Sequence, residues 1–399
     1  MNFKTHQAAL PLGFKACGIS ARIKKSSKLD LALLYSETPC VAAGVFTANR
    51  IKAAPVDLCI RILGSKRPVR AIIANSGNAN CMTGAQGVRD AFDMSRSVAS
   101  ELGVKPHEVL VSSTGIIGRL LPMEKIKTAV PYLVSALSGG KLKDAAEAIL
   151  TTDTFAKIAV KKINIGGRAV TFAGIAKGAG MIAPNMKHAT MLAYILTDAA
   201  ISRYALDKAA SECLGPSFNA ITIDGCMSTN DTAIILANGA AGNRAIGSTG
   251  NVYKVFAVAL KEVCLELAKM IVRDAEGATK FIEISVRGAR NGIEADRLAK
   301  SVANSNLFKC AMFGSDPNWG RIAAALGAVP SGLVWQKMDI VLNGRPVFRN
   351  GRPIAVKDAG SLKGRLVEVE INLRQGAGFA RVYTSDLSYE YVRINAEYN

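Results

Sequence analysis

Histidine and aromatic residues are scarce in this chain of 399 residues, which contains three histidines and 6% aromatic residues. With so few histidines, a Ser-His-Asp triad has few candidates for its general base. Nucleic-acid surfaces combine a basic stripe with aromatic rings on which bases stack, whereas the lysines and arginines here are scattered. The net charge of +19 is therefore more typical of a solvated basic surface or of small acidic ligands, and we expect no nucleic-acid partner.

Long apolar runs and paired cysteines are also missing. No uncharged apolar stretch reaches the roughly 18 residues that cross a bilayer, and residues 8–14, which include Pro11, make a poor signal-peptide core. The eight cysteines show no C-x-x-C spacing, so zinc and thioredoxin-like sites lack support and reduced thiols are expected. These features predict a cytoplasmic protein with no membrane attachment and no metal.

The residues that are present describe a packed protein of mixed α and β class. Hydrophobic residues make up 49% and charged residues 20% of the chain, as in ordinary globular proteins. Apolar periodicity changes repeatedly between helical spacing and alternation, and the last part of the chain is mostly strand and turn, which indicates antiparallel sheet covered by helices. Helices are predicted over 84–102, 122–137, 141–150, 202–214, 252–272 and 293–313. Strands are predicted over 41–46, 70–74, 109–112, 158–163, 169–175, 191–196, 220–223, 233–236, 281–286, 340–342, 367–373 and 380–385.

Two glycine-rich strings imitate phosphate-binding loops. Residues 178–183 contain G-x-G-x-x-A, but Pro184 follows where a dinucleotide-binding fold would open a helix. Residues 375–380 resemble the Q-x-x-G-x-A loop of one class of coenzyme A binding acetyltransferases, but strand-forming residues follow. We discount both strings as phosphate-binding loops, because the residues that follow them do not begin a helix.

The segment 177–198 holds the strongest chemical signal. A loop rich in glycine and containing proline leads to Ala189 and Thr190, after which the chain becomes an apolar strand. A threonine freed at a new N-terminus can use its own α-amino group as the base, so such a nucleophile needs no histidine. The alternative is that Thr190 simply begins a strand, where β-branched residues are common.

The residues from Gly178 to Asp198 resemble the maturation site of the ornithine acetyltransferase (ArgJ) family, and the resemblance extends over nearly the whole chain. Seven further strings occur in the expected order. They are FTANR (46–50), ANSGNAN (74–80), SSTGIIG (112–118), TTDTF (151–155), IDGCMSTNDT (223–232), RDAEGATK (273–280) and DPNWGR (316–321).

The resemblance implies self-cleavage between Ala189 and Thr190, which would give an α chain of residues 1–189 and a β chain of residues 190–399. Thr190 would then be the catalytic nucleophile. In this chain Lys187 and His188 stand directly before Ala189, where the family usually runs from Asn-Met straight into Ala-Thr.

The family's other site residues fall on six positions of this sequence. Thr114 and Gly115 match its oxyanion hole. Thr151, Lys177, Glu276 and Asn395 match substrate-binding positions, together with Thr190 itself.

The resemblance further implies an α/β (α+β) fold of the ArgJ/DmpA-like kind, a sandwich of stacked β-sheets flanked by helices as in N-terminal-nucleophile enzymes. The implied activity is ping-pong transfer of acetyl from N2-acetylornithine to glutamate in arginine biosynthesis, by an α2β2 heterotetramer that needs no cofactor. Acetyl-CoA as a second acetyl donor is left open. Two other hypotheses stay open here, a self-processed aminopeptidase or amidase and a basic binding protein that is never cut.

Overall fold

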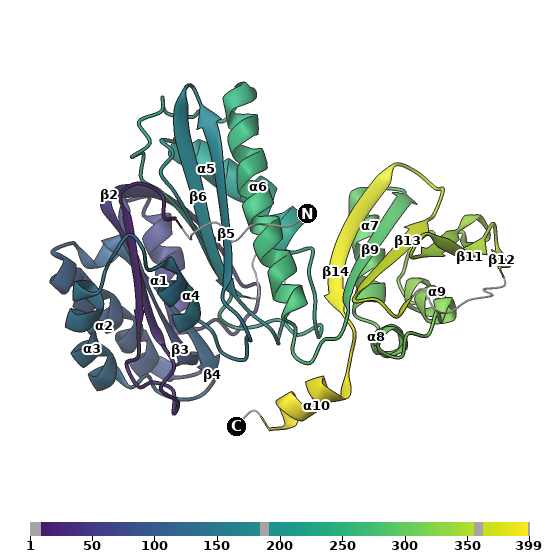
Figure 1. Cartoon of the computed structure of the whole chain (residues 1–399), viewed down its shortest axis with the longest axis horizontal. Coiled ribbons are helices and arrows are strands. Elements are labelled where there is room, and N and C mark those ends of the chain that lie inside the picture. The colour runs from purple at the N-terminus through teal and green to yellow at the C-terminus, as the bar shows by residue number, and fades with distance from the viewer. Residues whose placement is uncertain (1–8, 184–190, 355–361, 398–399) are drawn as a thin grey trace. The chain divides into compact units, whose positions relative to one another are not determined.

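The computed structural model describes residues 9–183, 191–354 and 362–397. These residues form two compact units (Figure 1). Unit 1 contains the described residues up to Gly178, residues 191–219 and Met227–Ile271. Unit 2 contains Ala179–Ala183, Ala220–Cys226 and the described residues from Val272 onward.

Within its described residues, unit 1 holds an eight-stranded sheet with the order β4-β3-β2-β8-β7-β6-β5, and β1 pairs with β2 beside this path. The pairs β3–β4 and β7–β8 are parallel, and the others are antiparallel. The strands are β1 (Phe14–Ile19), β2 (Leu31–Phe46), β3 (Val69–Asn78), β4 (Val109–Ile116), β5 (Lys157–Ile165), β6 (Arg168–Lys177), β7 (Leu192–Thr197) and β8 (Thr232–Ala237).

The long strand β2 joins two halves of this sheet. Its first part pairs with β1 and β3, and its second part, from Val41, pairs with β8. Buried side chains of both halves, such as Ile72 on β3 and Ile175 on β6, belong to one hydrophobic core. Because side chains alternate along a strand, Phe172 and Gly174 on β6 face away from that core and pack on the long helix α6 (Gly250–Arg273). The two halves of the sheet thus share one core, and α6 covers the other face of β6. This arrangement confirms the predicted sandwich of stacked sheets flanked by helices.

The other helices of unit 1 begin and end at ordinary sequence signals. Pro55 stands in the first turn of α1, Ser202 caps α5 through its side chain, and Gly103 ends α2 in the left-handed conformation. These helices are α1 (Ala54–Gly64), α2 (Gly84–Leu102), the 3-10 turn η1 (Pro106–Glu108), α3 (Met123–Ser135), α4 (Leu142–Ala148) and α5 (Arg203–Phe218).

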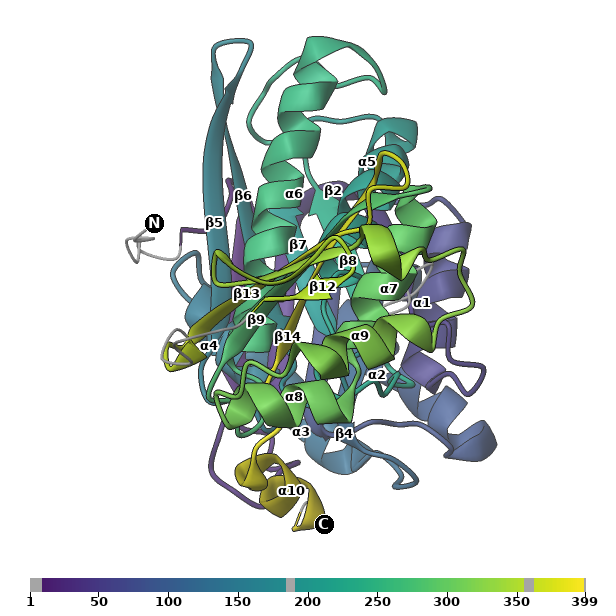
Figure 2. The same ribbon diagram turned by 90° about the vertical axis from the view of Figure 1, so that its right-hand side faces the viewer.

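The described part of unit 2 contains a six-stranded sheet with the order β12-β11-β10-β13-β9-β14, in which only β9 and β13 run parallel. Side chains of α7, α8 and α9 share a hydrophobic core with β9, β10 and β13, and the three helices, β9 and β13 are labelled in Figure 2. The strands are β9 (Phe281–Ala289), β10 (Asp339–Leu342), β11 (Arg345–Arg349), β12 (Arg352–Pro353), β13 (Leu366–Asn372) and β14 (Gly378–Ser385). The helices are α7 (Gly292–Ala303), α8 (Asn306–Phe313), α9 (Trp319–Gly327), the 3-10 turn η2 (Trp335–Lys337) and α10 (Tyr389–Ala396).

Two predicted elements differ from the structure. The helix predicted over 293–313 is divided into α7 and α8, because Asn304 ends the first and the side chain of Ser305 caps the second. The strand predicted over 220–223 is an isolated bridge between Ile221 and Tyr383. Among the described residues, no helix combines the length and apolarity that a membrane crossing requires.

Candidate active site

Three predicted site residues of unit 1 meet at the end of β6. Lys177, the last residue of that strand, is buried. Its Nζ donates a hydrogen bond of 2.7 Å to Thr151 Oγ1 and a longer one of 3.4 Å to Thr114 Oγ1. Thr114 lies on β4 and Thr151 in the turn before β5. The structure therefore brings together, around one ammonium group, residues that are 26 and 63 positions from it in the sequence.

The start of β7 is paired with the same lysine. In the antiparallel register of β6 and β7, Leu192 lies opposite Lys177. Ala189 and Thr190, the predicted cleavage pair, lie outside the described residues. Leu192 is two positions after Thr190, and the strand predicted to follow Thr190 is confirmed as β7.

Gly115, the second predicted oxyanion residue, lies where two backbones touch. In the parallel register of β3 and β4 it stands opposite Gly77. A Cβ on Gly115 would come within 2.4 Å of the carbonyl carbon of Gly77 and 2.5 Å of the nitrogen of Asn78, and the φ angle of Gly115 is +135°. Any side chain at position 115 would thus be strained and would push the strands apart.

Asp153 organises this cluster, although no role was predicted for it. Oδ1 accepts hydrogen bonds from Lys157 Nζ (2.7 Å) and the Gly178 N–H (2.6 Å), and Oδ2 accepts one from the Thr151 N–H (3.0 Å). Oδ2 also lies 3.9 Å from Lys177 Nζ. The side chains of Asp153 and Lys157 are fully buried. Burial alone would raise the pKa of Asp153, but the charges of Lys177 and Lys157 and the hydrogen bonds outweigh it and hold that pKa well below its usual range.

We expect Asp153→Ala to lower the free energy of unfolding by about 3 to 5 kcal/mol at pH 7, because two lysines would lose their buried counter-ion. The matched control is Asp296→Ala, whose partly exposed surface pair with Lys300 should contribute less than about 1 kcal/mol. Since the folded-state pKa of Asp153 is lowered, its stabilisation is complete above about pH 4 and is lost as the pH falls toward the lowered value. Urea unfolding of both variants measures the difference. Equal losses would contradict this role.

In unit 2, the structure brings together the predicted residues Glu276 and Asn395. Asn395 Nδ2, on α10, donates a 2.8 Å hydrogen bond to Glu276 Oε2, and Glu276 is buried. A Cβ on Gly180 would lie 2.3 to 2.6 Å from the carboxyl group of Glu276. Glycine at position 180 therefore lets the loop backbone lie directly against this carboxylate.

Asp224 is a second residue for which no role was predicted. Its carboxylate accepts the backbone N–H groups of Met181 (2.6 Å) and Ile182 (2.9 Å), and Tyr391 on α10 donates its hydroxyl to Oδ2 at 3.3 Å. Asp224 and Asp153 both stand inside strings quoted for the family resemblance. An acidic residue within a glycine- or threonine-rich turn beside a strand is the signal that could have singled them out.

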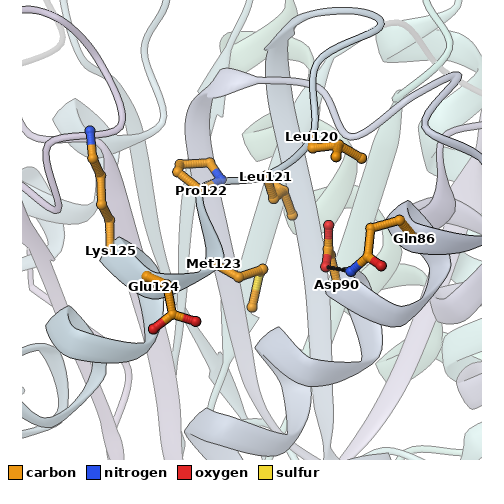
Figure 3. A pocket seen from close by; sticks show the side chains of 8 residues that line it. All are labelled: Gln86, Asp90, Leu120, Leu121, Pro122, Met123, Glu124 and Lys125. Atoms are coloured by element: carbon orange, nitrogen blue, oxygen red, sulfur yellow. Dashed lines mark hydrogen bonds between the residues drawn. The ribbon is translucent and has the colours of Figure 1, made fainter.

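A pocket elsewhere in unit 1 contains none of the predicted site residues. Figure 3 shows it between α2 and the start of α3, where Gln86 donates a 2.7 Å hydrogen bond to Asp90. The residues that line it are Gln86, Asp90, Leu120, Leu121, Pro122, Met123, Glu124 and Lys125.

Comparisons with known proteins agree on one family. The model of the ArgJ family matches residues 15–399. The arginine biosynthesis bifunctional protein ArgJ of Geobacter sulfurreducens is 49% identical over 393 residues, which are 97% of this chain and 98% of that protein. The protein of the same name from Bacillus subtilis is 43% identical over 397 residues, 99% of this chain and 97% of its own.

A solved structure agrees with these sequence matches. The crystal structure of the arginine biosynthesis bifunctional protein ArgJ from Bacillus halodurans is 37% identical with a TM-score of 0.51, and the match covers 52% of this chain and 99% of that one. Because the family model spans the chain from residue 15 to its last residue and relatives match along almost their whole length, this chain belongs to the ArgJ family.

Proposed function

We propose that this enzyme of arginine biosynthesis transfers an acetyl group from N2-acetylornithine to glutamate by a ping-pong mechanism, after cutting itself between Ala189 and Thr190. Membership of the ArgJ family supports the pathway and the reaction class. The observation that carries the proposal is the pairing of Leu192 with Lys177, whose Nζ also contacts Thr114 and Thr151. The sequence thus attaches the proposed nucleophile to a strand end that lies beside the proposed oxyanion and carboxylate-binding groups.

Self-cleavage would begin with the hydroxyl of Thr190. Its oxygen attacks the carbonyl carbon of Ala189, the peptide C–N bond breaks and the nitrogen takes a proton, which leaves an ester. Water then hydrolyses the ester, so that one chain ends in the carboxylate of Ala189 and the other begins with the free amine of Thr190. That amine becomes the base for the next reaction.

In the transfer reaction, Thr190 would attack the acetyl carbonyl of N2-acetylornithine, release ornithine and hold the acetyl group as an ester until the amine of glutamate takes it. The Thr114 hydroxyl and the Gly115 N–H would stabilise the negative charge of each tetrahedral intermediate. Both substrates carry a carboxylate, for which Lys177 is the proposed partner. The carboxylate of Glu276, oriented by Asn395, is the proposed partner of a substrate ammonium group.

The length of the solved relative supports a divided chain. The Geobacter sulfurreducens and Bacillus subtilis proteins match this chain along 98% and 97% of their length, whereas 52% of this chain covers 99% of the Bacillus halodurans chain. Residues 190–399 would number 399 − 189 = 210, about half of the chain. We propose fragments 1–189 and 190–399 assembled as a cytoplasmic α2β2 heterotetramer that needs no metal or cofactor. The relatives are named bifunctional, and we propose that this chain also has a second activity, in which acetyl-CoA is the acetyl donor.

Mass spectrometry of the purified protein tests the exchange. With N2-acetylornithine alone, the fragment that begins at Thr190 should gain one acetyl group, and glutamate should remove it with formation of N-acetylglutamate. Kinetically, double-reciprocal plots at varied glutamate should be parallel, since a covalent intermediate separates the two half-reactions. If the acetyl group is instead released as free acetate at the same rate with or without glutamate, the enzyme is an amidase and the transferase proposal is wrong.

A further inference from the structure

Lys24 carries a second ammonium group of unit 1, beside the cluster formed by Lys177, Thr114 and Thr151. Lys24 itself is half-buried. Its Nζ donates hydrogen bonds to the carbonyl oxygen of Leu150 (2.7 Å) and to that of Leu29 (3.0 Å). Leu150 directly precedes Thr151, whose hydroxyl accepts from Lys177 Nζ. The two lysines are thus bound to consecutive residues of one turn.

The stem of Lys24 lies at the oxyanion end of the same site. A Cβ on Gly77 would come 3.0 Å from the Cγ of Lys24, and Gly77 is the residue that the backbone of Gly115 touches. Two separate contacts, one through the turn at Leu150 and one through Gly77, therefore tie Lys24 to the groups proposed to hold the substrate.

In the part of the chain that the structure describes, the ammonium of Lys24 forms no ion pair with a carboxylate. Asp30, the nearest acid in the sequence, uses both oxygens for backbone N–H groups: those of Ala21, Ile23 and Lys24 itself. Among the residues that the structure describes, no carboxylate lies within ion-pairing distance of Lys24 Nζ, and two of its three N–H donors have acceptors. One N–H donor of the ammonium is therefore available to a ligand.

We propose that Lys24 is a specificity-determining residue that binds the side-chain carboxylate of the acidic acceptor, while Lys177 binds the carboxylate common to both substrates. The assignment rests on the proposed function. Glutamate ends in a carboxylate and ornithine in an ammonium group, so a cation beside Lys177 attracts the first and repels the second. The same charge thereby favours the departure of ornithine once its acetyl group has been transferred.

The charge of Lys24 should also make acceptor binding depend on pH. Burial lowers the pKa of Lys24 to about 8; Asp30 and Asp153 oppose the shift, and Lys177 and Lys28 add to it. As the pH rises from 7 to 9 the ammonium loses its proton, so the KM for glutamate should rise in the wild type. In Lys24→Arg the guanidinium stays charged, and this rise should be absent.

The two half-reactions, measured separately, test the proposal. Lys24→Met should raise the glutamate concentration needed for half-maximal deacetylation on the order of tenfold or more, which is the loss expected for a charge-assisted hydrogen bond. The N2-acetylornithine concentration needed for half-maximal acetylation should stay the same or fall. Lys25→Met is the matched control, because Lys25 is exposed on the same loop and carries the same charge; it should change neither value.

The possible results separate this assignment from the proposed function. An equal loss in both half-reactions, or no loss in either, would overturn the role of Lys24 and leave the acetyl transfer intact. A wild-type protein that never becomes acetylated would overturn the proposed function, and this assignment with it. If Lys24→Met fails to fold, Lys24→Gln retains an N–H donor for Leu150 and allows the same comparison.

Discussion

Thr190→Ala should leave the purified protein as a single chain of 42.1 kDa with no acetyltransferase activity, whereas the wild type should give fragments of about 20 and 22 kDa. The fragment masses follow in proportion from 189 and 210 of the 399 residues. Alanine lacks the hydroxyl that attacks the Ala189 carbonyl, so neither the cut nor the acetyl-enzyme can form. A denaturing gel and N-terminal sequencing, which should read Thr-Met-Leu-Ala for the second fragment, measure the result.

Thr190→Ser is the control for this variant. Serine keeps a hydroxyl at the same position, so the chain should still be cut and should retain part of its activity. An intact wild-type protein with full activity would contradict the mechanism. So would cleavage of Thr190→Ala at the same bond, since the proposed nucleophile would then be unnecessary.

Thr114→Ala should lower kcat on the order of a hundredfold, corresponding to about 3 kcal/mol of lost transition-state stabilisation. The oxygen of Thr114 accepts a hydrogen bond from Lys177, which leaves the hydroxyl hydrogen free to point toward a developing oxyanion. The fold should survive, because only a hydroxyl and a methyl group are removed. Steady-state kinetics and thermal unfolding of the purified variant measure both effects.

Thr151→Ala provides the comparison for Thr114→Ala. Thr151 contacts the same lysine at 2.7 Å but is matched to substrate binding, so its loss should raise KM more than it lowers kcat. Thr114→Ser should restore most of the rate. If kcat is unchanged in Thr114→Ala, the hydroxyl has a structural role and Gly115 would be the remaining proposed oxyanion donor.

Elements with local signals could be predicted from the sequence. The helix predicted over 84–102 coincides with α2, which Gly103 ends in the left-handed conformation. The strands on either side of the Gly166-Gly167 turn are also confirmed as β5 and β6. By contrast, the sequence pattern predicts no helix over 54–64, because the apolar pattern there is short. The structure has α1 in this segment, with Pro55 in its first turn.

The site could be predicted only in part, for a physical reason. Apolar periodicity describes which side chains face a core, but the interactions of Asp153, Asp224 and Lys24 depend on contacts between distant segments. Lys24 and Leu150 are separated by 126 positions and Asp224 and Met181 by 43. The family resemblance supplied Thr114, Thr151, Lys177, Glu276 and Asn395, and the structure adds the groups that hold them. The roles of all these residues stay predictions.

The strand order of unit 1 has a consequence for a chain cut at position 189. The first fragment would contain β1 to β6 and the second would contain β7 and β8. In the sheet, however, β7 and β8 lie between β6 and β2. Neither fragment could leave without breaking two ladders of backbone hydrogen bonds. Unfolding would release two separate polypeptides, and their return to the native state would become a bimolecular encounter that slows on dilution. The mature protein would then stay folded because it unfolds slowly, and not because its separated fragments refold quickly.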